Sequence, residues 1–301
     1  MRITLTADTI LAEARDQTDA LLAQWAETLR HRFQGEEGPA IAYALASPGK
    51  RVRAALVLAS YRAVGGTSSA IAGIAAAVET VHTYSLVHDD LPCMDDDDLR
   101  RGRATTHRAF DIPTATRVGY MLVPVAAMVL SRAARDLGLG TESLGRMAED
   151  LFQAGGIEGM VGGQWMDLEA EQRALDLGEL TAVHRGKTGA LIQSACVLGG
   201  LAAEANAPQL AALSGFGEEI GLAFQVADDV LDVTGTSDEL GKTAGRDEAL
   251  QKSTFVRLMG VEGARQEAAR LARRAIEHLD GAGIASPSLA TLADYIVNRR
   301  S

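Results

Sequence analysis

The sequence contains few of the residues that define several classes of protein. Its two cysteines, Cys93 and Cys196, form no CxxC pair and show no Cys/His spacing suited to zinc, so we expect a reduced, cytoplasmic protein. Aromatic residues make up only 4% of the 301 residues, whereas hydrophobic residues make up 47%. That apolar share is enough for a large core and excludes disorder as a description of the whole chain.

A long uncharged hydrophobic run is also missing. The longest extends from Tyr120 to Leu130 and is interrupted by Pro124, whereas a membrane span needs about 18 or more apolar residues. The first residues, MRITLTADTILAEARDQTD, reach charged side chains too early for a signal peptide. We therefore expect neither a membrane span nor a secretion signal.

Basic residues do not dominate the composition. There are 29 of them against 40 acidic residues, which gives a formal net charge of −11. This balance argues against a nucleic-acid partner, which normally needs a basic face. It leaves small anionic substrates open, because bound divalent metals can invert the local field.

Sustained alternation of β-branched residues is absent, and the hydrophobic period is helical almost throughout. From 8 to 30, apolar residues recur at steps of three or four, with Asp8 expected as the N-cap. The fold class predicted is all-α, and no Pro/Ser-rich linker divides the chain, so we expect one domain over 1–301. About ten helices are expected, near 8–30, 39–46, 51–63, 70–91, 113–137, 142–163, 179–200, 208–234, 253–279 and 287–299.

Six aspartates stand within ten residues of the segment SLVHDDLPCMDDDDLRRG, 85–102. Asp89 and Asp90 are expected to end an apolar helix, because Pro92 cannot continue it undisturbed. A break there would bring Asp95 back beside Asp89. Taken alone, the aspartates at 95–98 are more typical of a solvated loop.

A second acidic cluster lies in AFQVADDVLDVTG, 223–235, within a strongly apolar helical segment. The spacing places Asp228, Asp229 and Asp232 on one helix face, where like charges destabilise a bare helix. Hard divalent cations, Mg²⁺ above all, suit such carboxylates and keep room for phosphate oxygens. The alternative is a wet helix face, which this short motif alone does not exclude.

Cationic residues accompany both clusters. Lys50 and Arg53 are expected to share a face at a helix N-terminus, which is a ready anion site, and His82 lies two helical turns before the first cluster. Any one such residue is usually a surface cation. Two acidic clusters each followed by basic residues instead predict a pocket that binds two diphosphates, one through metals and one through cations alone. The remaining cations are Arg100, Arg101, Lys187 and Lys242.

At these residues the chain resembles the trans-isoprenyl diphosphate synthases, or polyprenyl synthases, and is most similar to their bacterial farnesyl diphosphate synthase (geranyltranstransferase) type. The resemblance runs nearly end to end. It implies an isoprenoid-synthase-type helical bundle around a deep central cavity, assembled as a homodimer. The matching segments are GKRVRAAL (49–56), ETVHTYSLVHDDLPCMDDDDLRRG (79–102), GGQWMDL (162–168), GKTGALI (186–192), FQVADDVLD (224–232), LGKTAGRD (240–247) and ADYIVNRR (293–300).

The resemblance also implies a role for each motif residue. The metal ligands, for three Mg²⁺ ions that Mn²⁺ can replace, would be Asp89, Asp95 and Asp228. The aspartates supporting them would be Asp90, Asp229 and Asp232. The allylic diphosphate would contact Arg100, Lys187 and Lys242, and isopentenyl diphosphate would contact Lys50, Arg53, His82 and Arg101. The residues facing the reacting carbons would be Thr188, Gln225 and Gln164.

The implied reaction is a head-to-tail condensation of isopentenyl diphosphate with dimethylallyl or geranyl diphosphate, giving (2E,6E)-farnesyl diphosphate. In this family, bulk before the first motif closes the floor of the cavity, and Tyr84 lies five residues before Asp89. Geranyl and geranylgeranyl diphosphate synthases stay open as alternatives. A class I terpene cyclase and a non-catalytic synthase subunit are disfavoured, because both aspartate motifs and the second cation set are present.

Three residues depart from the family pattern, and none is a proposed ligand. Ala104 and Val256 stand where proline is frequent, and Tyr120 follows Gly119 where aspartate is frequent. Tyr120 is the departure with the clearest expected consequence, because a bulky side chain there would alter the cavity wall and with it the product length.

Overall fold

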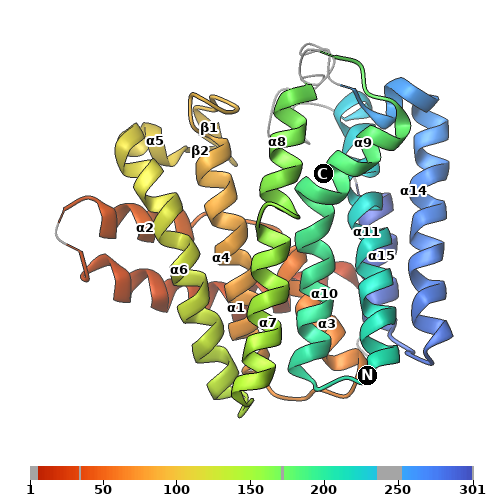
Figure 1. The fold of residues 1–301 in the computed structure, drawn as a ribbon, viewed down its shortest axis with the longest axis horizontal. Helices are drawn as coiled ribbons and strands as arrows, with labels where there is room; N and C mark the ends of the chain where they lie inside the picture. Colours follow the sequence, from red (N-terminus) through yellow and green to blue (C-terminus); the bar gives the residue numbers. More distant parts are fainter. Residues whose placement is uncertain (1–5, 34, 171–172, 236–252, 300–301) are drawn as a thin grey trace. The chain divides into compact units, whose positions relative to one another are not determined.

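The computed structural model describes residues 6–33, 35–170, 173–235 and 253–299, and nearly all of them are helical (Figure 1). The chain divides into two compact units. The N-terminal unit consists of Asp8–Leu58 and Ser68–Ala148, and the C-terminal unit of Met1–Ala7, Ala59–Thr67 and Glu149–Ser301. The all-α prediction is confirmed, while the single domain and its central cavity stay predictions.

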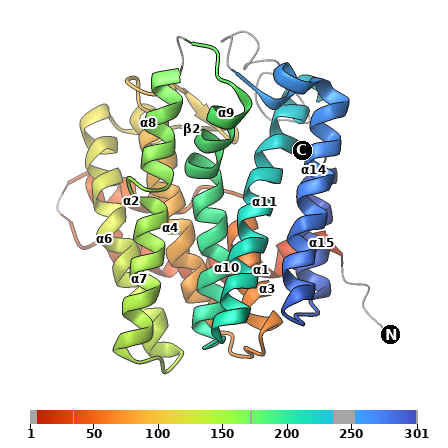
Figure 2. The same cartoon turned by 45° about the vertical axis from the view of Figure 1, so that its right-hand side comes forward.

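The N-terminal unit is built around two neighbouring helices, α4 and α6, which pack against each other (Figures 1 and 2). Most of α4 is buried, which agrees with its nearly uninterrupted run of Ala, Val and Ile. Asp111 caps α6 by accepting a hydrogen bond from the backbone N–H of Thr114 at 2.6 Å. The elements are α1 (Ala7–Arg30), α2 (Glu37–Leu45), the first part of α3 (Val52–Ala63), α4 (Ile71–Asp89), β1 (Leu99–Arg100), β2 (Arg103–Ala104), α5 (Thr106–Ala109), α6 (Ile112–Asp136) and the first half of α7 (Thr141–Gly155).

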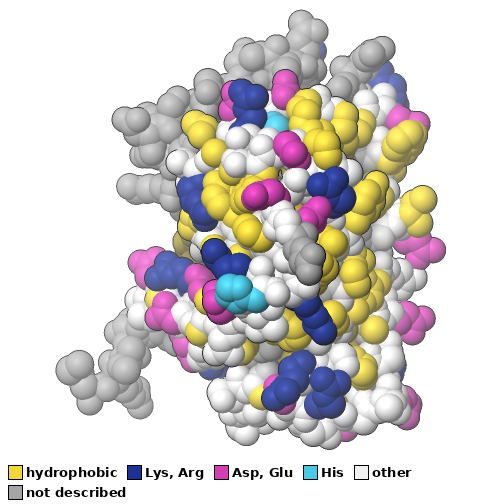
Figure 3. Space-filling view, turned by 90° about the vertical axis from the view of Figure 1, so that its left-hand side faces the viewer, with side chains coloured by type: hydrophobic (Ala, Val, Ile, Leu, Met, Phe, Trp, Pro, Cys, Tyr) yellow, Lys and Arg dark blue, Asp and Glu magenta, His cyan; other side chains and the backbone are white. Residues whose placement is uncertain are grey.

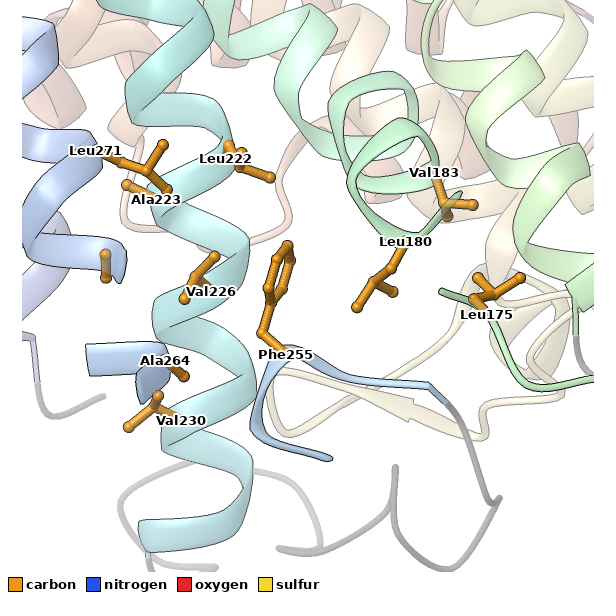
Figure 4. Packing of buried hydrophobic residues seen from close by; sticks show 11 residues of the cluster. Leu175, Leu180, Val183, Leu222, Ala223, Val226, Val230, Phe255, Ala264 and Leu271 are labelled. Atoms are coloured by element: carbon orange, nitrogen blue, oxygen red, sulfur yellow. The ribbon is translucent and has the colours of Figure 1, made fainter. Parts of the chain in front are cut away.

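The C-terminal unit surrounds the long helix α11, which lies between α10 and α14 (Figure 2). Phe255 projects between Val226 of α11 and Leu180 of α9, and its ring stacks on His184 with the centroids 5.7 Å apart (Figure 4). This apolar cluster fixes α11 against its neighbours. The elements are α8 (Met160–Ala170), α9 (Leu177–His184), the π-helix η1 (Arg185–Gly189), α10 (Ala190–Ala202), α11 (Ala207–Thr234), α14 (Phe255–Gly281) and α15 (Pro287–Asn298).

Several predicted boundaries are wrong. Helix α1 begins at Ala7, so Asp8 lies in its first turn and is not the N-cap. The segment expected as one helix over 142–163 ends at Gly155, and a new helix begins at Met160. The segment over 179–200 is interrupted by a π-helical turn, a feature that hydrophobic periodicity does not reveal.

One helix among the described residues, α6, is long and apolar enough to cross a membrane by length and composition. Half of its most apolar window is buried inside the protein. Core helices pass the same test, so this helix is weak evidence for a span. On the face shown in Figure 3, acidic and basic side chains lie interspersed among hydrophobic ones.

A partly buried carboxylate in the C-terminal unit has a perturbed acidity. Asp150 accepts a hydrogen bond from the Ser194 hydroxyl at 2.5 Å, and burial raises its pKa from 3.8 to about 6. The folded protein therefore holds this proton at pH values where the unfolded chain releases it. The stability that the protonated carboxyl contributes is complete below about pH 3.8 and is lost as pH rises through 6.

Replacing Asp150 by asparagine is expected to stabilise the protein by about 1–2 kcal/mol at pH 7, with no gain at pH 4. The amide oxygen still accepts from Ser194 but carries no charge to bury. Urea denaturation of variant and wild type at several pH values measures the difference. Asp111→Asn is a control for which the opposite change in stability is expected at pH 7. The hydrogen bond from Thr114 lowers the pKa of Asp111, so the ionised carboxylate stabilises the folded protein. A gain for Asp150→Asn that does not depend on pH would contradict this interpretation.

Candidate functional site

The first aspartate motif forms where α4 ends, in the N-terminal unit. Helix α4 stops at Asp89, and the chain turns through 91–94. The backbone N–H of Asp95 then donates to the carbonyl of Asp89 at 2.8 Å, so the predicted return of Asp95 beside Asp89 is confirmed. Two half-buried carboxylates on one short turn suit a hard divalent cation.

Asp90 differs from these two aspartates in its surroundings. It is 3% exposed, and Arg100 donates to its carboxylate through Nε at 2.6 Å and Nη2 at 2.5 Å. Burial raises the pKa of Asp90, and the hydrogen bond from Arg100 offsets part of that rise. The pair therefore fits a supporting role in which Asp90 fixes the guanidinium of Arg100.

Arg101 lies in the tight turn of the β1–β2 hairpin. It has φ 53° and the following Gly102 has φ 74°, the left-handed pair that a two-residue hairpin turn requires. Its guanidinium donates to the carbonyl of Pro48 and packs on Gly49, where a Cβ would come within 2.5 Å of Nη1. A non-glycine residue in this conformation is strained, which is a frequent property of binding sites.

The hairpin is held against α2 and the loop that follows it. The Tyr43 hydroxyl donates to the carbonyl of Ala104 at 2.6 Å, and Arg103 lies 4.3 Å from the Tyr43 ring centroid. Arg103 also donates to the carbonyl of Ala46 at 2.9 Å. Ala104, one of the departures from the family pattern, thus contributes its backbone to this anchor.

The predicted pairing of Lys50 and Arg53 on one helix face is wrong. Helix α3 begins only at Val52, and Arg51 has φ 56°, so Lys50 precedes the helix. The cause is Arg51, which is buried and bonded to Asp19 at 2.7 Å and to Glu79 at 3.1 Å. These ion pairs turn the chain where the spacing predicted a helix.

His82 nevertheless lies in a cationic region, as predicted. Its Nε2 is 3.4 Å from Nη1 of Arg53. Burial lowers the pKa of His82 well below 6.5, and the charges of Arg53, Arg101, Arg100 and Arg51 lower it further. His82 is therefore neutral at pH 7 and presents Nε2 as an acceptor to a guanidinium. Such a concentration of arginines is suited to a diphosphate.

Tyr84 belongs to a row of three rings in the same unit. Its ring meets His88 edge-on with centroids 5.7 Å apart, and His88 meets Tyr120 at 5.3 Å. Burial raises the pKa of Tyr84, and Asp89 adds to that rise. Tyr120 is 68% exposed, and its connection to Tyr84 in this row runs through His88.

The second aspartate motif lies on α11 in the C-terminal unit, and its members have different partners. Asp229 accepts hydrogen bonds from Gln225 at 3.1 Å and from the Phe255 N–H at 2.8 Å, so the protein itself engages both of its oxygens. Asp232 is buried. Asp228 is half-exposed and bonded to Arg299 at 2.5 Å through one oxygen. Of the three, Asp228 is the one that is not buried.

Lys187 and Thr188 stand on the π-helix η1. Lys187 donates to Asp167 of α8 at 2.5 Å, and Thr188 donates to Gln225 at 3.1 Å. The π turn aims both side chains toward different neighbouring helices, α8 and α11. Sequence reasoning assigned no role to Asp167, although it lies in the matching segment GGQWMDL, because no spacing rule connects it to a lysine 20 residues later.

The other predicted residues have mixed outcomes. Gln164 is buried, and its amide finds no hydrogen-bond partner within the described chain. Val256 packs against the Phe255 cluster. Lys242 and the segment 240–247 lie outside the described residues. Within the parts of the chain that are described, no three Asp, Glu, His or Cys side chains come close enough to hold a metal alone.

A model of the protein family described as polyprenyl synthetase matches residues 38–283, a range that includes both aspartate motifs. The chain is 36% identical over 300 residues to the farnesyl diphosphate synthase of Geobacillus stearothermophilus, covering 98% of each. It is 44% identical to that of Escherichia coli K12, covering 83% of this chain and 85% of the relative. A chloroplastic geranylgeranyl pyrophosphate synthase of Catharanthus roseus is 43% identical, over 85% and 72%. The chain belongs to the polyprenyl synthetase family of prenyltransferases.

Solved structures agree with this membership. An apo FPP/GFPP synthase from Zymomonas mobilis superposes with a TM-score of 0.83 at 34% identity, covering 97% of this chain and 98% of that one. A geranyltransferase from Helicobacter pylori, solved in complex with magnesium and isoprenyl diphosphate, has a TM-score of 0.82 at 31% identity, over 99% and 98%.

Proposed function

We propose that this chain condenses isopentenyl diphosphate head-to-tail with dimethylallyl or geranyl diphosphate, giving (2E,6E)-farnesyl diphosphate and diphosphate. The observation that carries the proposal is the first aspartate turn, in which Asp95 returns to Asp89 in the same unit as a cluster of arginines around neutral His82. The diphosphate groups of the two substrates thus have different candidate partners: metals held by carboxylates for the allylic diphosphate, and arginines for isopentenyl diphosphate. The similarity to farnesyl diphosphate synthases over nearly the whole chain supports the same conclusion.

The carboxylates proposed as metal ligands are chemically suited to Mg²⁺, and to Mn²⁺ in its place. Asp89 and Asp95 offer hard oxygen donors on one turn, and Asp228 keeps one oxygen apart from Arg299. The related geranyltransferase complex contains magnesium, which supports this choice. Bound Mg²⁺, for which we propose three ions per active site, would stabilise the charge of the departing diphosphate.

The other residues would bind and orient the two substrates. Arg100, held by Asp90, and Lys187, held by Asp167, would contact the allylic diphosphate together with Lys242. Isopentenyl diphosphate would contact Arg101, Arg53, His82 and Lys50. The linked amide and hydroxyl of Gln225 and Thr188 would face the reacting carbons beside Gln164.

The reaction breaks the allylic carbon–oxygen bond, and the diphosphate leaves with the bonding electrons. The double bond of isopentenyl diphosphate then attacks the allylic cation, forming one carbon–carbon bond. The resulting cation loses a proton, which the departing diphosphate accepts. Neutral His82 is bonded to a guanidinium, so it would act in binding and not as the base.

We also propose that the protein works as a cytoplasmic homodimer. Helix α8 and the turn before it expose apolar side chains that a second copy would cover. Ile157 is 82% exposed, Trp165 63% and Val161 41%. Ile157 and Trp165 border a groove of about 630 Å³ along α8 and η1.

Product length tests the farnesyl assignment. Wild-type protein incubated with Mg²⁺, isopentenyl diphosphate and geranyl diphosphate is expected to give a dominant C15 product. Tyr84→Ala is expected to shift the dominant product to C20, because the ring that would limit the growing chain is removed. Chromatographic sizing of the products, with Tyr61→Ala as a Tyr-to-Ala control at a buried ring outside this row, measures both.

A dominant C20 product from the wild type would favour the geranylgeranyl alternative and contradict the role of Tyr84. No product with either primer would contradict the enzymatic assignment as a whole.

A further inference from the structure

We propose that Arg299 is a positioning residue for Asp228, an internal counter-ion that neutralises this carboxylate before a metal binds and leaves one oxygen available to the metal. The proposal rests on the proposed function, because it takes Asp228 as a metal ligand. It concerns a residue at the C-terminal end of α15, 71 positions from its partner in the chain.

The guanidinium of Arg299 is buried against α11. Its side chain is 3% exposed, and Nη2 donates to Oδ1 of Asp228 at 2.5 Å and to the carbonyl of Phe224 at 3.2 Å. The guanidinium carbon also lies 3.7 Å from the centroid of the Phe224 ring, within range of a cation–π interaction. A buried arginine needs a compensating charge, and Asp228 supplies it.

A cation beside the aspartate motif reduces the repulsion among its carboxylates. Asp228 and Asp232 share a helix face, and like charges at this spacing destabilise a helix. Asp229 accepts hydrogen bonds from Gln225 and from the backbone of Phe255, and both of these donors are neutral. Arg299 therefore supplies to α11, in the metal-free protein, part of the charge that Mg²⁺ would supply.

The geometry also allows the arginine and a metal to share Asp228. Only Oδ1 is bonded to Arg299, and the Asp228 side chain is 45% exposed. Arg299 keeps its contacts with the ring and carbonyl of Phe224 whether or not Asp228 also binds a metal. The ring and the carbonyl of Phe224 also contact the guanidinium, so Asp228 is not the sole group holding it in place. The positive charge that remains beside the metal weakens metal binding.

If Arg299 and Mg²⁺ share Asp228, removing the arginine is expected to lower stability in the absence of Mg²⁺ and to strengthen Mg²⁺ binding. In Arg299→Gln, the melting temperature without Mg²⁺ is expected to fall, and saturating Mg²⁺ is expected to recover most of the loss. The Mg²⁺ concentration at half-maximal stabilisation is expected to fall roughly tenfold, because a like charge near the metal has been removed. Thermal unfolding at increasing Mg²⁺ with constant inorganic diphosphate measures both.

Arg274→Gln is the matched control. Arg274 pairs at 2.8 Å with buried Glu219, which lies on the same helix α11 nine residues before Asp228. Its loss is expected to lower the melting temperature without changing the response to Mg²⁺. Arg299→Lys keeps the charge and is expected to retain the wild-type half-saturating Mg²⁺ concentration, which a purely structural role for the planar guanidinium does not predict.

Asp228→Asn separates failure of this inference from failure of the proposed function. If Asp228→Asn loses the Mg²⁺ response while Arg299→Gln responds as the wild type does, the counter-ion role of Arg299 is overturned and the metal assignment stands. If Asp228→Asn keeps the full wild-type response, the metal assignment of Asp228 fails, and the role of Arg299 fails with it.

Discussion

Replacing Asp89 or Asp228 by asparagine is expected to lower kcat by roughly 10³–10⁴-fold while the protein stays folded. Each change removes a charged ligand from the metals that would stabilise the departing diphosphate. Asparagine is preferable to alanine at position 228, because its oxygen still accepts from Arg299, whereas alanine leaves a buried guanidinium unpaired. Turnover is measured by incorporation of isopentenyl diphosphate, and folding by circular dichroism and melting temperature.

Asp98→Asn is the matched control within the same motif. Its side chain is 64% exposed and pairs with exposed Arg108 at 2.7 Å, an arrangement that contributes little to stability. Near-normal turnover is expected for this variant. The same result for Asp89→Asn or Asp228→Asn would show that the metal assignment is wrong.

Gly163→Ala is expected to destabilise the protein by about 2–3 kcal/mol and to raise KM for the allylic substrate. Helix α8 meets the π-helix η1 backbone to backbone, and a Cβ on Gly163 would overlap the backbone nitrogen of Lys187. Backbone atoms cannot rotate away as a side chain can, so the two segments must separate and Lys187 must shift. Urea denaturation and substrate titration measure the two effects.

Gly145→Ala tests whether the effect comes from this contact. Gly145 lies within α7, and among the described residues no atom beyond the local helix backbone lies within 4 Å of the place that a Cβ would take. Because alanine has the higher helix propensity, this variant is expected to gain about 0.5–1 kcal/mol. Unchanged stability in Gly163→Ala would mean that α8 and η1 do not approach as closely as the structure shows.

The local sequence was sufficient to predict the structure where nearby residues control the backbone. The return of Asp95 to Asp89 follows from Pro92, which cannot continue a helix, and the distance involved is only six residues. The common face of Asp228, Asp229 and Asp232 follows from helical geometry. The all-α class follows from hydrophobic periodicity, which the apolar helices α4, α10 and α11 display clearly.

Sequence reasoning failed where distant charges control the backbone. Lys50 was placed on a helix because its spacing to Arg53 fits one, but Arg51 bonds to Asp19 and Glu79 and takes a left-handed conformation. Neither partner lies within 25 residues of Arg51, so no local pattern reveals them. The π-helix that carries Lys187 is missed for a similar reason, because it is defined by backbone hydrogen bonds and not by side-chain type.

The sequence by itself determined the helical class, the two aspartate motifs and the set of cations that accompany them, because helix periodicity and like-charge spacing are local properties. Only the tertiary structure decided which partner each charged group has. It pairs Asp90 with Arg100, Lys187 with Asp167 and Asp228 with Arg299. These pairings depend on helix packing, which brings together side chains as many as 71 residues apart and which no local sequence pattern reveals.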